Sequence, residues 1–183
     1  PVLLALNAQL HVRSKAGTRV ISIDDFFLGY RQTALKPGEI LEGIWVPDSA
    51  PGSKTSAYKV SRRRELDISS VAAGIVVTLD EGSVVRAVRI GVGGMASTPI
   101  RAKQTENFLM GKPWTEELVE DAAQLIEKEF SPLSDHRSSE WYRRKLIGNL
   151  LRGFFEETKG ADFVAIPHAP TATLVLEEIH DQV

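Results

Sequence analysis

The stretch that decides the fold runs from Ser56 to Ala102 and reads SAYKVSRRRELDISSVAAGIVVTLDEGSVVRAVRIGVGGMASTPIRA. Val71 to Leu79 is apolar and rich in β-branched residues, and Val84 to Val92 alternates along its length. Between them, Asp80-Glu81-Gly82-Ser83 has the composition of a tight turn, in which Gly82 is free to take a positive φ. The stretch therefore predicts a β-hairpin within a sheet that has one buried face.

Three helix patterns follow this hairpin. Thr98-Pro99 is typical of an N-cap with proline at the first helical position, and Gly111 is typical of the end of that helix. Thr115 predicts the N-cap of a second helix, and Ser138 or Ser139 that of a third. Strands followed by helices favour an α+β domain, with helices on one face of an antiparallel sheet. The expected apolar stripes are Leu118, Val119, Ala122, Leu125 and Ile126, and then Tyr142, Leu146, Ile147, Leu150 and Phe154.

The residues before the linker predict smaller elements. Val2 to Leu10 is apolar and predicts a short buried helix, and Asp24 is expected to cap a turn or short helix near Phe26. Strands are expected at 10–13, 18–23 and 39–46, with a polar loop at 30–37.

The segment DSAPGSKT is rich in Pro, Gly and Ser and predicts a domain boundary. Because Pro1 opens directly into an apolar run, we expect this chain to be part of a longer polypeptide. The expected organisation is the last portion of a larger domain at 1–48, a linker at 49–55, an α+β domain at 56–160 and a C-terminal extension of unassigned role at 161–183.

Composition limits the classes of function. The 183 residues carry a net charge of −2, which argues against an extended nucleic-acid footprint. The absence of cysteine excludes disulfides, thiolate-bound iron–sulfur clusters and a cysteine nucleophile within this chain, and it favours a reducing compartment such as the cytoplasm. No apolar run reaches the roughly 18–20 residues that span a bilayer, so no membrane contact is expected.

Most motifs that carry chemistry are missing. The four histidines, at positions 11, 136, 168 and 180, lack the spacing of metal ligands, and no G-x-S-x-G motif is present. Gly91-Val92-Gly93-Gly94 lies between a strand and a helix, where phosphate-binding loops occur, but it lacks both phosphate fingerprints. We therefore interpret these glycines as sites of close backbone packing.

The charged residues at the entrance to the hairpin leave two interpretations open. Lys59, Arg62, Arg63, Arg64, Glu65 and Asp67 form this cluster. One interpretation is a solvated, self-paired charge run. The other is a set of cations that holds an anionic or reducible ring. Alternation along the strand places Lys59 and Tyr58 on opposite faces. Tyr30-Arg31 also has two interpretations: an aromatic ring and a cation on which a ligand stacks, or ordinary exposed surface.

At these residues the sequence resembles the flavoprotein part of the molybdenum hydroxylases. FFLGYR at 26–31 and LKPGEIL at 35–41 resemble the end of that family's FAD-binding domain. Tyr58-Lys59, Arg63-Arg64 and Asp67-Ile68 resemble the opening of its C-terminal flavoprotein domain. The resemblance continues in order through GGMA at 93–96, PIRA at 99–102 and DHRSSEWYR at 135–143.

The resemblance implies electron transfer, and within the family it is strongest to the small subunit of a bacterial xanthine dehydrogenase. Such enzymes hydroxylate a purine at a molybdopterin-bound molybdenum and pass electrons through two 2Fe–2S clusters and FAD to NAD. The implied partners are the remainder of the FAD and iron–sulfur subunit and a molybdenum-binding subunit, in an oligomer of heteromers. The implied FAD-binding residues are Leu41, Lys59, Tyr30, Arg63, Arg64 and Asp67, with no catalytic residue and no metal ligand in this chain.

The sequence departs from the family pattern at two points, and one alternative function stays open. Leu66 stands where some relatives have an acidic residue, which leaves the electron acceptor open between NAD and another molecule. The glycine-rich segments that bind pyrophosphate in relatives have no counterpart in this chain, so we expect it not to bind FAD tightly by itself. The alternative is a scaffold whose sheet, third helix and apolar start at Val2 to Leu6 pack on partner chains without any cofactor.

Overall fold

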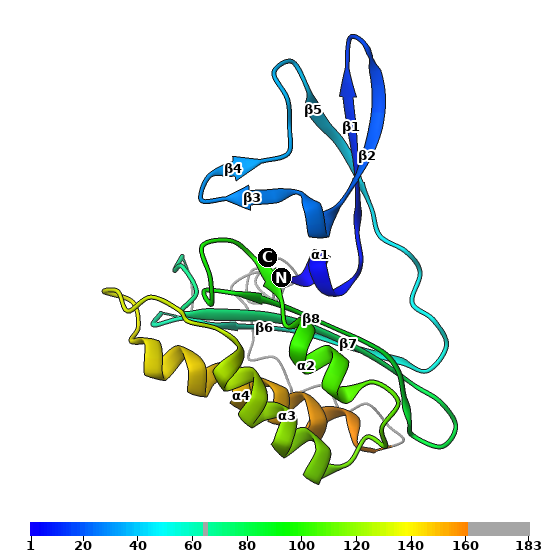
Figure 1. The fold of residues 1–183 in the computed structure, drawn as a ribbon, viewed down its shortest axis with the longest axis vertical. Helices are drawn as coiled ribbons and strands as arrows, with labels where there is room; N and C mark the ends of the chain where they lie inside the picture. Colours follow the sequence, from blue (N-terminus) through cyan, green and yellow to red (C-terminus); the bar gives the residue numbers. More distant parts are fainter. Residues whose placement is uncertain (64–65, 161–183) are drawn as a thin grey trace, which may run out of the picture.

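The fold consists of two units, each built around an antiparallel β-sheet, as Figure 1 shows. The computed structural model describes residues 1–63 and 66–160. The N-terminal unit contains α1 (Val2–Ala5), β1 (Gln9–Ser14), β2 (Gly17–Ser22), the 3-10 helix η1 (Ile23–Asp25), β3 (Phe27–Gly29), β4 (Gln32–Thr33) and β5 (Ile40–Trp45). The C-terminal unit contains β6 (Ser53–Val60), β7 (Val71–Leu79), β8 (Val85–Gly93), β9 (Ile100–Arg101), α2 (Lys103–Leu109), α3 (Glu116–Glu129) and α4 (Glu140–Thr158).

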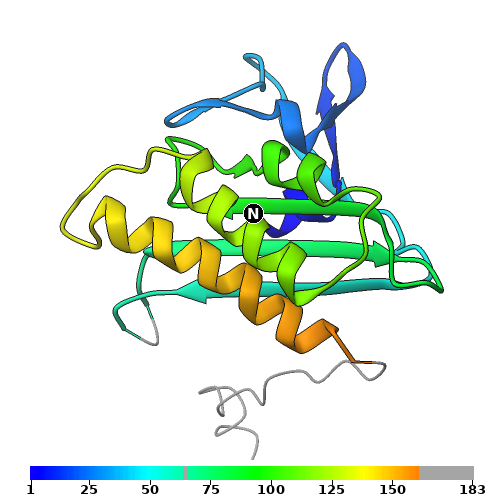
Figure 2. The same cartoon turned by 60° about the horizontal axis from the view of Figure 1, so that its bottom comes forward.

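The C-terminal unit is the predicted α+β layer. Its strands lie in the order β6-β7-β8-β9, each antiparallel to its neighbour, and α3 and α4 cover one face of the sheet (Figure 2). In the N-terminal unit the described strands form a sheet in the order β2-β1-β5, beside the small β3–β4 hairpin. No helix in the described part of the chain is both long and apolar enough to cross a membrane.

The hairpin of β7 and β8 is confirmed, with Ile75 opposite Ile90. Its turn differs in one detail from the prediction. Positive φ falls at Ser83 (58°) and not at Gly82. The carboxylate of Asp80 explains this, because its Oδ1 accepts the backbone N–H groups of both Gly82 and Val84, at 3.0 and 2.8 Å, and so fixes the turn.

The main core lies between this sheet and the helices. It includes Ile75 and Ile90 from the strands and Ile126 from α3, all of which are fully buried. Leu151 and Phe154 of α4 complete it. The stripes predicted for the second and third helices therefore face the sheet, with Tyr142 as an exception, since its side chain is exposed and Arg143 is the buried residue of that turn.

The opposite face of the sheet is not left open, contrary to the prediction of a single buried face. Helix α1 lies on it, and three glycines make room for the helix. A Cβ atom at Gly74 would come within 2.7 Å of the Val2 Cα, and one at Gly91 would overlap the Pro1 carbonyl oxygen. The interpretation of the Gly91–Gly94 segment as a site of close packing is thereby confirmed.

Two of the predicted helix starts are confirmed and two are wrong. Thr115 and Ser139 cap α3 and α4 as predicted, each accepting a backbone N–H three residues later. The start predicted at Thr98-Pro99 is wrong, because Ile100 and Arg101 pair with β8 as an edge strand and α2 begins only at Lys103. The predicted cap at Asp24 is also wrong: Ser22 caps η1, and the Asp24 carboxylate binds arginines of the other unit.

Two expected irregular segments contain strands. Strand β6 begins at Ser53, inside the segment expected to be a linker, and Ser53 Oγ lies 2.8 Å from Thr78 Oγ1 of β7. The segment expected to be a polar loop contains β4, which pairs with β3. The expected extension at 161–183 lies outside the described residues.

Candidate cofactor site

Lys59 lies near the end of β6, on the face of the sheet that carries α1. Its neighbour Tyr58 points to the helix face, where Tyr58 Oη donates to Glu157 Oε2 at 2.7 Å. Burial raises the pKa of the Tyr58 phenol to well above its usual value, and the Glu157 carboxylate adds to this effect. The Lys59 side chain is exposed, and none of the ion pairs between described residues includes it.

A shallow hollow of about 350 Å³ adjoins this position, and we call it the flat hollow. Strand pairing places Lys59 opposite Ala72, and Ala72 opposite Gly93, so these three residues form one row across the sheet. Ala72 and Gly93 form part of the floor of the flat hollow, and Pro1 borders it. The row therefore places a cation beside two small residues, and the Pro1 ring lies against the second of them.

A second depression, of about 580 Å³, continues from the first, and we call it the basic hollow. Ile68 and Arg137 line both. Arg62, Arg63 and the loop of His136 form its wall, and the guanidinium of Arg62 donates to the His136 carbonyl oxygen at 3.0 Å. The basic hollow thus brings two arginines of the β6–β7 loop beside the loop that precedes α4.

Asp67 organises the β6–β7 loop and is not free to bind a ligand with both oxygens. Its Oδ2 accepts the backbone N–H of Arg63 at 3.0 Å, and its Oδ1 accepts that of Ile68 at 2.9 Å. These hydrogen bonds, above all the one from Arg63, hold the pKa of Asp67 below its usual value. The charge cluster is therefore partly self-paired, while Lys59 has no ion-pair partner within residues 1–63 and 66–160. Arg64 lies outside the described residues.

Arg143 is a structural residue of this site that the sequence reasoning missed. The guanidinium is buried and donates to the carbonyl oxygens of Ser70 and Gly94 and, at 2.7 Å, to Asp135 Oδ1. It joins the loop before β7, the loop after β8 and the loop before α4, which all border the flat hollow. The apolar periodicity of the helix gave no signal for it, because a buried arginine is recognised only by its partners.

The predicted residues of the N-terminal unit lie on the same side of the four-stranded sheet as α1. Figure 1 shows the β3–β4 hairpin and β5 on that side, away from α3 and α4. Tyr30, at the hairpin tip, is 70% exposed, and the Arg31 guanidinium lies 5.3 Å from the centre of its ring. Leu41 of β5 pairs with Val12 of β1 and is 40% exposed. The fold thus places Tyr30, Leu41 and Lys59 on one side of the sheet.

Comparison with known families identifies the class of protein. Residues 56–158 match the family model of the CO dehydrogenase flavoprotein C-terminal domain, and residues 1–49 match that of the FAD binding domain in molybdopterin dehydrogenase. The chain belongs to the flavoprotein family of the molybdenum hydroxylases and is part of their flavoprotein module.

Relatives of this chain carry several names. The xanthine dehydrogenase/oxidase of Gallus gallus is 41% identical over 136 residues, which cover 72% of this chain and 10% of that protein. The glyceraldehyde dehydrogenase medium chain of Sulfolobus acidocaldarius is 36% identical over 157 residues, covering 85% of this chain and 54% of that one. The carbon monoxide dehydrogenase medium chain of Afipia carboxidovorans is 32% identical over 154 residues, covering 84% and 53%. The chain thus spans about half the length of these medium chains.

Solved structures of other proteins share the fold of this chain. CO dehydrogenase from Oligotropha carboxidovorans superposes with a TM-score of 0.78 at 29% identity, covering 86% of this chain and 55% of that one. Quinoline 2-oxidoreductase from Pseudomonas putida 86 superposes with a TM-score of 0.74 at 28% identity, covering 86% and 54%. The named substrates differ among these proteins, so the narrower resemblance to a xanthine dehydrogenase remains a proposal.

The residues on this face fit part of a flavin nucleotide. An exposed cation beside a hollow floored by small residues suits the polar edge of an isoalloxazine ring, which gains negative charge on reduction. The glycines at 91–94 do not suit the phosphates, because a Cβ atom at Gly93 would already meet the Pro1 ring at 3.0 Å and one at Gly94 would overlap the Ser70 carbonyl. The described residues thus offer one wall for a ring and no cradle for its pyrophosphate.

Proposed function

We propose that this chain is part of the FAD module of a molybdenum-dependent oxidoreductase of the xanthine dehydrogenase type, in which electrons pass from iron–sulfur clusters via FAD to NAD. The observation that carries the proposal is the position of Lys59. It is an exposed lysine without an ion-pair partner among the described residues, at the end of a row of small residues, in a chain of a flavoprotein family.

In this proposal each residue has a limited task. Bound FAD would supply the ability to take up two electrons and release them to an acceptor. Lys59 would stand at the polar edge of the ring, where its charge favours the reduced, anionic form and so raises the potential. Leu41 would give an apolar contact to the ring, and Tyr30 an aromatic surface beside it.

The β6–β7 loop would set access to the ring. Arg63, held through Asp67, and Arg64 would supply positive charge where the acceptor approaches. Exposed Leu66 adds no charge there, so the proposal of NAD as acceptor rests on the family resemblance and not on this loop.

Partners and location are part of the same proposal. Two of the relatives are named as medium chains, which suggests that further chains complete the enzyme. We propose that a molybdenum-binding subunit and an iron–sulfur part with two 2Fe–2S clusters complete it, since this chain has no cysteine. The same lack of cysteine is consistent with the cytoplasm.

The variant Lys59→Ala tests the proposal in the protein purified with the chains that accompany it. A charged contact to the ring contributes about 1.5 kcal/mol, so FAD should dissociate about tenfold more readily. The flavin potential should also fall. Lys15→Ala, which removes another exposed lysine from the β1–β2 turn, should change neither FAD retention nor the flavin potential. Unchanged FAD retention and potential in the Lys59 variant would remove this residue from the site.

The scaffold without a cofactor remains the second candidate function. The observation in its favour is the exposure of apolar residues on β5, namely Ile40, Ile44 and Trp45. The apolar start supports it only in part, because Val2 is 40% exposed while Leu4 and Ala5 are buried, and the apolar stripe of α4 largely faces the core. A protein that is colourless when purified with its partners, without a flavin absorption band, would favour the scaffold.

A further inference from the structure

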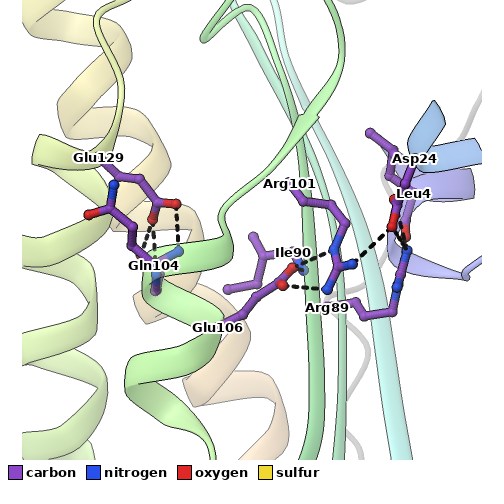
Figure 3. Close-up of polar contacts among 9 residues, drawn as sticks. Leu4, Asp24, Arg89, Ile90, Arg101, Gln104, Glu106 and Glu129 are labelled. Carbon is purple, nitrogen blue, oxygen red and sulfur yellow. Dashed lines mark hydrogen bonds and ion pairs between the residues drawn. The ribbon is translucent and has the colours of Figure 1, made fainter. Parts of the chain in front are cut away.

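The two units are joined by a carboxylate that binds two arginines from the other unit (Figure 3). Asp24 of η1 belongs to the N-terminal unit. Arg89 of β8 donates to both of its oxygens, at 3.0 and 3.2 Å, and Arg101 of β9 donates to Oδ2 at 3.0 Å. We call Asp24, Arg89, Arg101 and Glu106 the clasp.

Both arginines are themselves held in place. The Arg89 Nε donates to the carbonyl oxygen of Leu4 at 2.9 Å, so the same side chain also binds the end of α1. Arg101 pairs with Glu106 of α2 through two nitrogens, and Glu106 Oε1 also accepts the backbone N–H of Ile90 at 2.7 Å. A chain of polar contacts thus runs from α2 through the sheet to η1.

The clasp is largely shielded from water. The side chains of Asp24, Arg89 and Arg101 are 23, 21 and 16% exposed, and that of Glu106 is 5% exposed. Burial lowers the pKa of Arg89, whereas in Arg101 the pairing with Glu106 and Asp24 outweighs burial and raises the pKa. Charges at such depth are screened less by water and salt than surface pairs, so removing one partner leaves the others with an uncompensated charge in a poorly hydrated place.

Asp24 stands where it can control the position of the candidate cofactor residues. Ser22 fixes the start of η1, and Ile23 is buried in the small core of the N-terminal unit. Strand β3 follows η1 directly and leads to Tyr30 at the hairpin tip. The partners of Asp24 lie on the sheet that carries Lys59. The clasp therefore connects the segment that leads to Tyr30 with the sheet that carries Lys59.

We propose that Asp24 is a positioning residue of the cofactor site, which holds Tyr30 and Leu41 at a fixed place relative to Lys59 without touching the ring. This inference rests on the proposed function, because it assumes a flavin in contact with Lys59 of one unit and with Tyr30 and Leu41 of the other. It goes beyond that function in assigning the relative placement of Tyr30, Leu41 and Lys59 to a residue of η1 that is not one of them.

The test compares Asp24→Asn with Asp25→Asn in the protein purified with its accompanying chains. Both variants remove one negative charge from η1, but the Asp25 side chain is exposed and forms no hydrogen bond or ion pair among the described residues. Loss of a negative charge acting through space would raise the flavin potential or leave it unchanged. Displacement of Lys59 from the ring would lower it.

We expect Asp24→Asn to lower the potential and to weaken FAD retention about threefold to tenfold, the range typical of residues that act through others. Asp25→Asn should lower neither the flavin potential nor the retention of FAD. A folded Asp24 variant with reduced stability but unchanged potential would show a purely structural role and overturn the inference. A rise in the flavin potential equal to the rise in Asp25→Asn would also overturn the inference.

A second variant keeps the test decisive if Asp24→Asn does not fold. Arg89→Lys keeps the positive charge but replaces the guanidinium, which donates to both Asp24 oxygens and to the Leu4 carbonyl, with a single ammonium that cannot make all of these contacts. It should lower the potential by less than Lys59→Ala does, and an unchanged potential overturns the inference. If Lys59→Ala shifts the potential while the clasp variants do not, only the positioning role fails. If the wild-type protein carries no flavin, the proposed function itself fails.

Discussion

Single residues in the middle of the sheet decide where α1 lies. Gly74 and Gly91 are paired with each other across β7 and β8, and Gly93 lies one step further along the same face. Their missing side chains allow the backbone of Pro1 and Val2 to rest directly on the strands. Since α1 contributes Leu4 to the smaller core, these glycines also set how closely the two units approach.

Gly91→Ala should therefore destabilise the protein. The added Cβ would overlap the backbone of Pro1 and lie 2.9 Å from the Leu4 Cβ, and such overpacking costs about 2 kcal/mol. Gly153→Ala is the matched control, because a Cβ there meets nothing within 4 Å and alanine stabilises a helix interior by about 0.5–1 kcal/mol. Urea unfolding measures both. Equal free energies of unfolding for the Gly91 variant and the wild type would show that α1 does not rest on this strand.

At the scale of elements, helix α2 depends on a neighbouring helix for its start. Its N-cap residue, Ala102, has no side chain that can accept a hydrogen bond. The carboxylate of Glu129, at the end of α3, accepts the N–H groups of Gln104 and Thr105 at 2.9 and 3.0 Å, together with the Thr105 hydroxyl (Figure 3). The start of one helix is thereby fixed by the end of the next.

Glu129→Ala should lower the free energy of unfolding by about 1–2 kcal/mol, the usual effect of removing a cap. Glu129→Gln, which keeps one acceptor oxygen, should have a smaller effect. The adjacent Lys128→Ala removes an exposed side chain and should stay within about 0.5 kcal/mol of the wild type. Chemical denaturation followed by circular dichroism gives these values, and a Glu129 variant as stable as the Lys128 variant would contradict the capping role.

At the scale of the whole molecule, acid should weaken both units over the same pH range. Pairing with Arg19 and the backbone N–H of Lys36 lowers the pKa of Glu39 to about 2, and pairing with Arg152 lowers that of Glu120 to about 2. The first pair connects β2 to the segment before β5, and the second connects α3 to α4. Each unit therefore contains a carboxylate that must be ionised to keep its partner.

The direction of the pH effect follows from these pKa values. A glutamate whose pKa is lower in the folded state than its ordinary 4.5 stabilises the protein fully above pH 4.5, and the contribution is lost as pH falls toward 2. The melting temperature should fall over this range, less steeply in Glu39→Gln and Glu120→Gln, and the difference should shrink in high salt. An unchanged slope in both variants would show that other carboxylates govern acid unfolding.

The sequence by itself determined the elements whose signals are local. The β7–β8 hairpin, the caps at Thr115 and Ser139, and the opposite faces of Tyr58 and Lys59 all depend on residues a few positions apart, and such short-range interactions can be recognised in one sequence. The resemblance to the flavoprotein family rests on several motifs that follow one another in the family's order, and it agrees with the matched family models.

Only the tertiary structure decided which charges meet. Asp24 binds arginines 65 and 77 residues away, and Arg143 binds the carbonyl oxygen of Ser70, 73 residues away. No local pattern marks such partners, because a carboxylate in a turn suits a cap as well as an ion pair until the fold brings a cation to it. The same reason explains why Asp24 was expected to cap η1 and instead joins the two units.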